Sequence, residues 1–148
     1  MAPHHTDTDG WIVVDIPGNQ CFGCGPDNPH GLRLRFRPVD AHTIEAPYCA
    51  DEHLCGAPQI VHGGIQAVML DEVMAMAVQT AYPDEHPTIV TADFRLEYKK
   101  PVPTGSEITI RARWERQDGR SHFVRGEIED AEGQLLTRAE ARWVDLDA

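Results

Sequence analysis

An α+β fold is predicted by the order of three kinds of segment along the 148 residues. Short extended segments come first, one long apolar segment follows over residues 65–81, and four long alternating segments complete the chain. Apolar side chains on most sides of residues 65–81 are typical of a buried helix. One helix buried by one sheet is an α+β arrangement. We expect residues 10–148 to form it as a single domain, after a disordered tail over residues 1–9.

The segments before the helix predict short strands and a loop. Residues 11–16 and 43–46 have the composition of short strands, and Pro47 is expected to end the second of them. Residues 32–38 alternate large apolar residues with arginine, which predicts a half-buried strand with a basic, solvated outer face. Residues 21–31 are rich in turn-forming residues and predict a loop.

The four segments after the helix alternate apolar and polar residues with the period of two that a half-buried strand requires. They cover residues 88–100, 107–116, 121–129 and 134–144. Gly119 and Gly133 lie in the short turns between the last three segments, which is a hairpin signal. We therefore expect a meander of hairpins.

Charge and composition exclude several classes of partner. The chain has 24 acidic and 13 basic residues, and its formal net charge is −11. This balance argues against nucleic acid and anionic membrane surfaces as partners. The N-terminal residues lack the apolar core of a signal peptide, and acids and glutamines interrupt the apolar segment too often for a membrane span. A cytoplasmic protein is expected.

The four cysteines, Cys21, Cys24, Cys49 and Cys55, follow the spacing C-x2-C-x24-C-x5-C. In a cytoplasmic protein they are expected to be reduced. The first pair has the spacing of zinc ligands, so a structural zinc site is one interpretation. The turn-rich residues after Cys24 support the other interpretation, in which the pair only shapes a loop. We favour the second, and expect no metal and no cofactor.

The apolar segment is preceded by Val61-His62-Gly63-Gly64. The first N–H groups of a helix have no intrahelical acceptor and carry a partial positive charge, so a carbonyl or an anion can bind there. Asp71 follows Gly63 by eight residues and has apolar neighbours. A carboxylate in such surroundings is costly unless it is paired or opens onto a cavity, where it could act as a general base. Glu72 is the alternative acid.

These residues resemble those of hotdog-fold acyl-CoA thioesterases of the phenylacetate-pathway type. The resemblance rests on the motif above with Asp71 and on three further stretches, Cys21–Leu32, Thr91–Phe94 and Tyr98–Pro101. It covers the chain from about residue 11 to the end. It implies a curved antiparallel sheet wrapped around one long helix, and a homodimer with edge-to-edge sheets, often paired into a homotetramer. The chain departs from related enzymes at Gly56, where they can carry asparagine.

The resemblance also implies a substrate, an acyl-CoA or acyl-carrier thioester, and roles for residues. The Gly63 amide would polarise the thioester carbonyl, with Gly64 beside it. Asp71 would act as nucleophile or general base, and Thr91 would position the attacking water or the carboxylate. His62 would shape the loop and bond near the sulfur.

The spacing of the motif supports an active site shared between two chains. Gly63 and Asp71 are separated by roughly 12 Å along one helix, too far for both to reach one carbonyl.

Lys99 and Lys100 are candidates for binding the CoA phosphates, with a charged strand end as the alternative. A non-catalytic acyl-CoA-binding or regulatory protein on the same scaffold is the alternative function.

Overall fold

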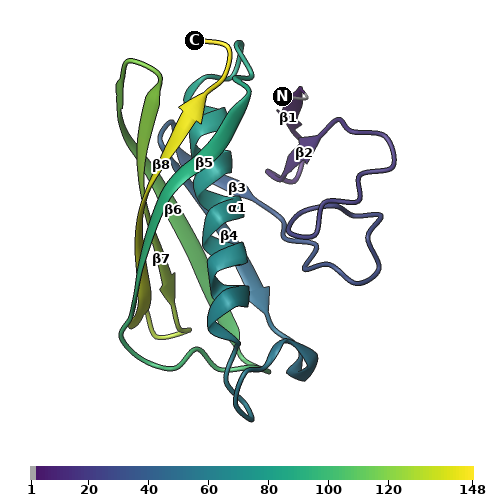
Figure 1. The fold of residues 1–148 in the computed structure, drawn as a ribbon. Helices are drawn as coiled ribbons and strands as arrows, with labels where there is room; N and C mark the ends of the chain where they lie inside the picture. The colour runs from purple at the N-terminus through teal and green to yellow at the C-terminus, as the bar shows by residue number, and fades with distance from the viewer. Residues whose placement is uncertain (1–2) are drawn as a thin grey trace.

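Residues 3–148 are described by a computed structural model, in which helix α1 lies between a six-stranded sheet and an N-terminal segment, residues 3–36 (Figure 1). The elements are β1 (His4–Thr6), β2 (Ile12–Val14), β3 (Arg37–Asp40), β4 (Thr43–Cys49), a 3-10 turn (Glu52–Leu54), α1 (Gly63–Ala81), β5 (Ile89–Tyr98), β6 (Glu107–Asp118), β7 (Ser121–Glu129) and β8 (Leu135–Asp145). The predicted α+β class is confirmed, and so is the hotdog architecture of a sheet around one long helix.

Helix α1 is buried on most of its sides, as its composition predicts. Met69, Leu70, Val73 and Met74 have no exposed surface. Close packing requires glycine at position 126 of β7, because a Cβ there would lie 2.8 Å from the Met74 sulfur and 3.0 Å from a Leu70 methyl carbon. Within residues 3–148 no helix combines the length and apolarity needed to cross a membrane.

The sheet is antiparallel throughout, with the order β3-β4-β6-β7-β8-β5. The expected meander is therefore correct for β6, β7 and β8 but wrong for β5, which pairs with β8 at the sheet edge. The reason lies in the connection over residues 99–106. It runs past the start of α1, where the Val61 amide donates to the Val102 carbonyl at 2.8 Å and Ile60 bridges to Pro103. The chain thus crosses the end of the sheet before β6 begins.

Strand β4 continues through Pro47, where we expected it to end. Pro47 pairs with Thr109 of β6, whereas the pairing of β4 with β3 reaches only as far as Glu45. Beyond Glu45, β4 is an edge strand of the described sheet. A proline is tolerated on an edge strand, because one side of the backbone has no strand to bond.

Residues 32–36 do not form the expected strand, although their alternation is correct. Leu32, Leu34 and Phe36 are buried, and the arginines between them are exposed. Arg33 has φ of 53°, in the left-handed region that breaks an extended strand. The backbone bonds instead to the preceding loop, through the Leu32 amide to the Phe22 carbonyl at 2.8 Å and the Leu34 amide to the Gly23 carbonyl at 2.9 Å.

The expected disordered tail also needs correction, because His4–Thr6 form β1 and pair with Ile12–Val14. Residues 1–2 of that tail lie outside the described residues.

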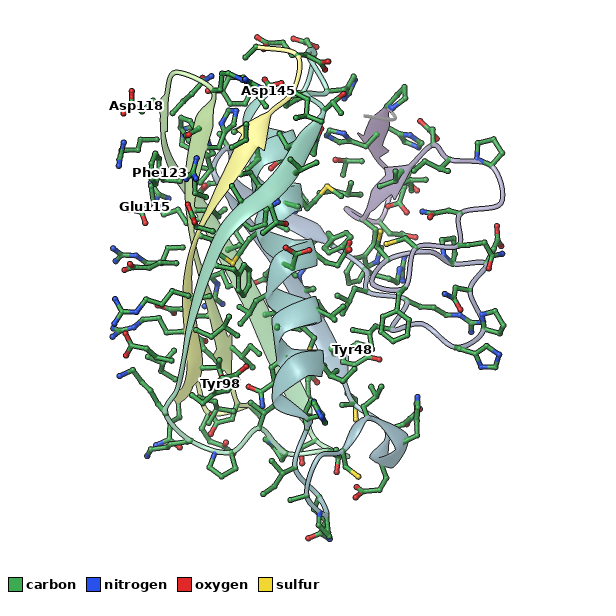
Figure 2. The ribbon with its side chains drawn as sticks, in the orientation of Figure 1. Tyr48, Tyr98, Glu115, Asp118, Phe123 and Asp145 are labelled. Atoms are coloured by element: carbon green, nitrogen blue, oxygen red, sulfur yellow. The ribbon has the colours of Figure 1, made fainter. Side chains whose placement is uncertain are left out.

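The polar outer face of the sheet follows the predicted alternation. Glu115 and Phe123 lie on the side of the sheet away from α1 (Figure 2), and Arg125 joins the outer face through an ion pair of 3.1 Å with Glu115.

The helix–sheet contact predicts that Gly126→Val destabilises the protein by about 1–3 kcal/mol, the usual range for overpacking a core. The added side chain would meet Met74 and Leu70 at the centre of the contact. Denaturant unfolding measures the change. Glu127→Val is the matched control, because Glu127 is the next residue of β7 and is only half-buried. Equal stabilities of the two variants would contradict this account of the packing.

Candidate active site

The entry to α1 is held by the side chain of His62, the residue before the first helical position. Its Nδ1 accepts a hydrogen bond of 2.9 Å from the Gly64 amide. Gly63 is the first residue of the helix, so its N–H has no intrahelical acceptor. Of the two glycine amides expected to meet the substrate, that of Gly64 is therefore already bonded. The Gly63 amide therefore remains available as a donor at the start of the helix.

Three residues outside the motif hold this turn in place. The buried side chain of Gln66 donates to the Val61 carbonyl at 3.0 Å and accepts from the Thr137 hydroxyl at 2.6 Å. From the other side, the Tyr98 hydroxyl donates to the Gly63 carbonyl at 2.9 Å, and Figure 2 shows Tyr98 near the beginning of the helix. The position of the Gly63 peptide is thus fixed by β8 and β5.

Asp71 lies two turns along the helix and is paired with Thr91 of β5. The Thr91 hydroxyl donates to Asp71 Oδ1 at 2.7 Å. Thr91 sits at a β-bulge, since it pairs with Trp143 while Asp93 pairs with Arg142, the adjacent residue of β8. The sequence could not show which face of β5 meets the site. The structure places Thr91 toward the helix and brings it together with Asp71.

Asp71 and Thr91 line a cavity of about 410 Å³ between α1, β5 and the N-terminal segment. The apolar part of its wall comes from both sides of the helix. It includes Val14, Ile16, Ala75, Met76, Ile89, Val90 and Trp143. Glu72 and the thiols of Cys21 and Cys24 also line it, beside a larger apolar surface. Such a cavity is suited to a ligand that has an apolar portion and a polar reacting group.

Glu72 faces the loop of residues 21–32, called here the cysteine loop, and not Thr91. The Cys21 thiol donates to Glu72 Oε1 at 3.4 Å. Burial is the main cause that raises the pKa of Glu72, and hydrogen bonds from Cys24 and Cys21 oppose it. Burial, together with the Glu72 charge, also raises the pKa of the Cys24 thiol. The two neighbouring acids therefore have different surroundings, with Asp71 paired to a hydroxyl and Glu72 to thiols.

The expected site residues form two groups within one chain. Asp71 and Thr91 line the cavity, whereas His62, Gly63 and Gly64 lie at the start of α1, outside the cavity wall. Lys99 and Lys100 belong to the second group, because they directly follow Tyr98, whose hydroxyl donates to the Gly63 carbonyl. The amides of both lysines donate to the Leu136 carbonyl. The Lys99 ammonium is ion-paired with Glu97 at 3.3 Å.

Sequence reasoning gave no role to three residues that hold the start of the helix, Gln66, Thr137 and Tyr98, although Tyr98 begins a stretch on which the resemblance rests. One signal was available for Gln66, a polar side chain one turn after the glycines in a mainly apolar helix. Thr137 and Tyr98 lie far from the motif in sequence, and each has the ordinary composition of a strand residue. Only the pairing of β5 with β8 brings them to one end of the sheet.

This fold and these residues define a protein of the hotdog thioesterase class. The chain belongs to the thioesterase superfamily, whose family model matches residues 58–137, more than half of the chain. The matched range contains His62, Gly63, Asp71 and Thr91, whereas the cysteine loop precedes it. The predicted resemblance is confirmed.

The chain is similar to acyl-coenzyme A thioesterase THEM4 of Rattus norvegicus, with 31% identity over 96 residues, which are 64% of this chain and 40% of the relative. For THEM4 of Mus musculus the identity is 31% over 113 residues, covering 76% of this chain and 46% of the relative. The chain thus spans less than half the length of these two relatives.

Among solved structures, a phenylacetic acid degradation-related protein of Ralstonia eutropha JMP134 is 31% identical, with a TM-score of 0.68, and the match covers 76% of this chain and 85% of that one. A thioesterase superfamily protein is 25% identical, with a TM-score of 0.77, and the match covers 86% of this chain and 61% of that one.

The network behind the glycines predicts that Thr137→Val destabilises the protein by about 1–3 kcal/mol, because it leaves the buried Gln66 Oε1 without its donor. Denaturant unfolding measures the loss. Thr109→Val is the control, since Thr109 lies on β6 and is only half-buried, and a change within about 0.5 kcal/mol is expected there. A Thr137→Val variant as stable as the control would show that the Gln66 network contributes nothing.

Proposed function

We propose that this chain hydrolyses acyl-CoA thioesters to a free acid and CoA. The observation that carries the proposal is the Asp71–Thr91 pair in the wall of a mainly apolar cavity. The hydroxyl occupies one carboxylate oxygen and orients the carboxyl group, which leaves the other oxygen for water or for the thioester carbon. The names of the THEM4 relatives support acyl-CoA as the substrate class.

Two chains would share each active site. Gly63 and Asp71 are separated by roughly 12 Å along one helix, so both cannot touch one thioester carbonyl in the same chain. Strand β5, which carries Thr91, is the last strand of the sheet, and residues 90–93 of it are exposed. An exposed strand edge is suited to pair with the same edge of a second copy. Such a homodimer would bring Gly63 of one copy toward Asp71 of the other.

In this arrangement the Gly63 N–H would donate to the thioester oxygen and stabilise the negative charge that develops there, a contribution of typically about 3–4 kcal/mol. Asp71 would remove a proton from water as the water attacks the carbonyl carbon. The C–S bond would then break, and CoA would leave as the thiol. In the alternative, Asp71 attacks directly and water hydrolyses the resulting anhydride. Lys99 and Lys100 lie beside Tyr98, at the Gly63 end, and would meet the CoA phosphates.

Asp71→Asn is expected to lower kcat by at least about a hundredfold, because the amide keeps the size of the carboxylate but lacks its basicity. The measurement is thiol release from aryl, short-chain, medium-chain and long-chain acyl-CoAs, with carrier-protein thioesters assayed in parallel. Glu72→Gln is the matched control and should cost much less. A near-normal kcat for Asp71→Asn, or a larger loss in Glu72→Gln, would show that the wrong acid is assigned. Binding of acyl-CoA without any thiol release by the unmodified protein would favour a non-catalytic binder.

Gly63→Pro is expected to lower kcat by about 10²–10³-fold, because it removes the donor proposed for the oxyanion. Proline is well tolerated at the first position of a helix, so α1 should still form. Gly63→Ala is the control that keeps the N–H, and its Cβ would lie 3.4 Å from the Tyr98 ring. Steady-state kinetics should show a much smaller loss for alanine than for proline.

The same two variants test the shared site. When Asp71→Asn and Gly63→Pro chains exchange at random, half of the dimers are mixed and each contains one intact site, so about a quarter of normal activity should return. Sites contained within single chains would restore none. A protein that sediments only as a 16.5 kDa species would likewise contradict the shared site.

A further inference from the structure

Three potential metal ligands line the same cavity as Asp71 and Thr91, and the proposed hydrolysis uses none of them. One ligand atom from each of Cys21, Cys24 and Glu72 lies within 4.8 Å of the other two, and all three residues are half-buried. The separation between Cys21 Sγ and Glu72 Oε1 is 3.4 Å. Zinc binds sulfur at about 2.3 Å and carboxylate oxygen at about 2.0–2.2 Å, so tetrahedral sites have S···O separations of roughly 3.5 Å. The cluster therefore has nearly the size of a zinc site.

The backbone of the cysteine loop is built to hold the thiols in this position. The Gly25 amide donates to the Cys21 carbonyl at 2.8 Å, and the Cys21 amide donates to the Asn19 side chain at 3.0 Å. A Cβ at Gly23 would overlap the Glu72 side chain, and one at Gly25 would overlap the Cys21 backbone. Both glycines are thus required for the loop to close on itself and to lie directly against Glu72.

The electrostatic surroundings of the cluster also favour a cation. Several acidic side chains of the sheet are paired with arginines, as in the pairs Arg111–Glu129 and Arg142–Asp93. Within residues 3–148, Glu72 forms no such ion pair with a basic residue, and its charged neighbour on the helix is Asp71. Two thiols and one carboxylate, once ionised, form a donor set that suits Zn²⁺ better than Mg²⁺ or Ca²⁺.

We propose that Cys21, Cys24 and Glu72 bind one Zn²⁺ ion, with a water molecule from the adjoining cavity as the fourth ligand. Three protein ligands with water in the fourth position are the coordination seen in catalytic zinc sites. The ion would fasten the cysteine loop to α1 at the residue next to Asp71, and so would hold the N-terminal wall of the cavity in place. This inference departs from the sequence-based expectation of a site without metal, because the sequence did not show that Glu72 meets the cysteine pair.

The test is elemental analysis of the purified protein, together with Co²⁺ substitution. We expect one zinc per chain, and after exchange the thiolate-to-cobalt charge-transfer bands and the visible bands of tetrahedral Co²⁺. Cys21→Ser and Cys24→Ser should lose the metal and these bands. Glu72→Gln should weaken zinc binding by at least about tenfold. Cys49→Ser is the matched control, because Cys49 is exposed and lies outside the cluster, and it should keep one zinc.

Thermal unfolding provides a second readout that does not depend on activity. A chelator should lower the Tm of the unmodified protein and of Cys49→Ser, but not that of Cys24→Ser, which has no metal to lose. Zinc-free protein that binds no Co²⁺ would overturn the proposal. So would full zinc content in Glu72→Gln with unchanged affinity, or a Cys21–Cys24 disulfide in freshly purified protein. None of these results decides whether the chain hydrolyses thioesters, which is tested separately through Asp71→Asn.

Discussion

The burial of helix α1 is the constraint on which the rest of the structure depends. The curved sheet covers one side of the helix and the N-terminal segment covers another (Figure 1). Residues such as Leu70 and Met74 have no exposed surface, and β7 approaches them closely only because position 126 is glycine. A helix enclosed in this way cannot shift along its axis without repacking many contacts. Its first residue and its acidic residues are therefore held at fixed positions relative to the sheet.

Enclosure of the helix determines how its acids can be used. A carboxylate among apolar neighbours requires polar partners, and the two acids obtain them from different elements. Asp71 meets a hydroxyl on β5, and Glu72 meets two thiols on the cysteine loop. Asp71 and Glu72 are adjacent in sequence but about 100° apart around the helix, so their side chains contact different elements. The residue that pairs with Thr91 and the residue that bonds to the cysteine loop are therefore consecutive residues of one helix.

The helix and the β6–β7–β8 hairpins could be predicted, because each depends on local signals such as periodicity and Gly119 in its turn. The partner of β5 could not be predicted, since it depends on the path of residues 99–106 past the helix start. The break in the strand at Arg33 could not be predicted either, because buried and exposed residues alternate over residues 32–36 although the backbone there is irregular. The Gln66–Thr137 bond and the contact of Glu72 with the cysteines join residues distant in sequence, and side-chain type alone does not reveal such contacts.

The division of the cavity wall follows from the same architecture. The range that matches the thioesterase superfamily, residues 58–137, includes the helix start, Asp71 and Thr91. The opposite wall comes from earlier residues, among them Val14, Ile16 and the two cysteines of the loop. An acyl group in this cavity would meet Asp71 and Thr91, the residues proposed for hydrolysis, on the part of the chain that matches the family. It would make much of its apolar contact with the N-terminal segment. Changes in the N-terminal segment could then alter which acyl groups fit without changing the Asp71–Thr91 pair, because the cysteine loop bonds to the helix through Glu72.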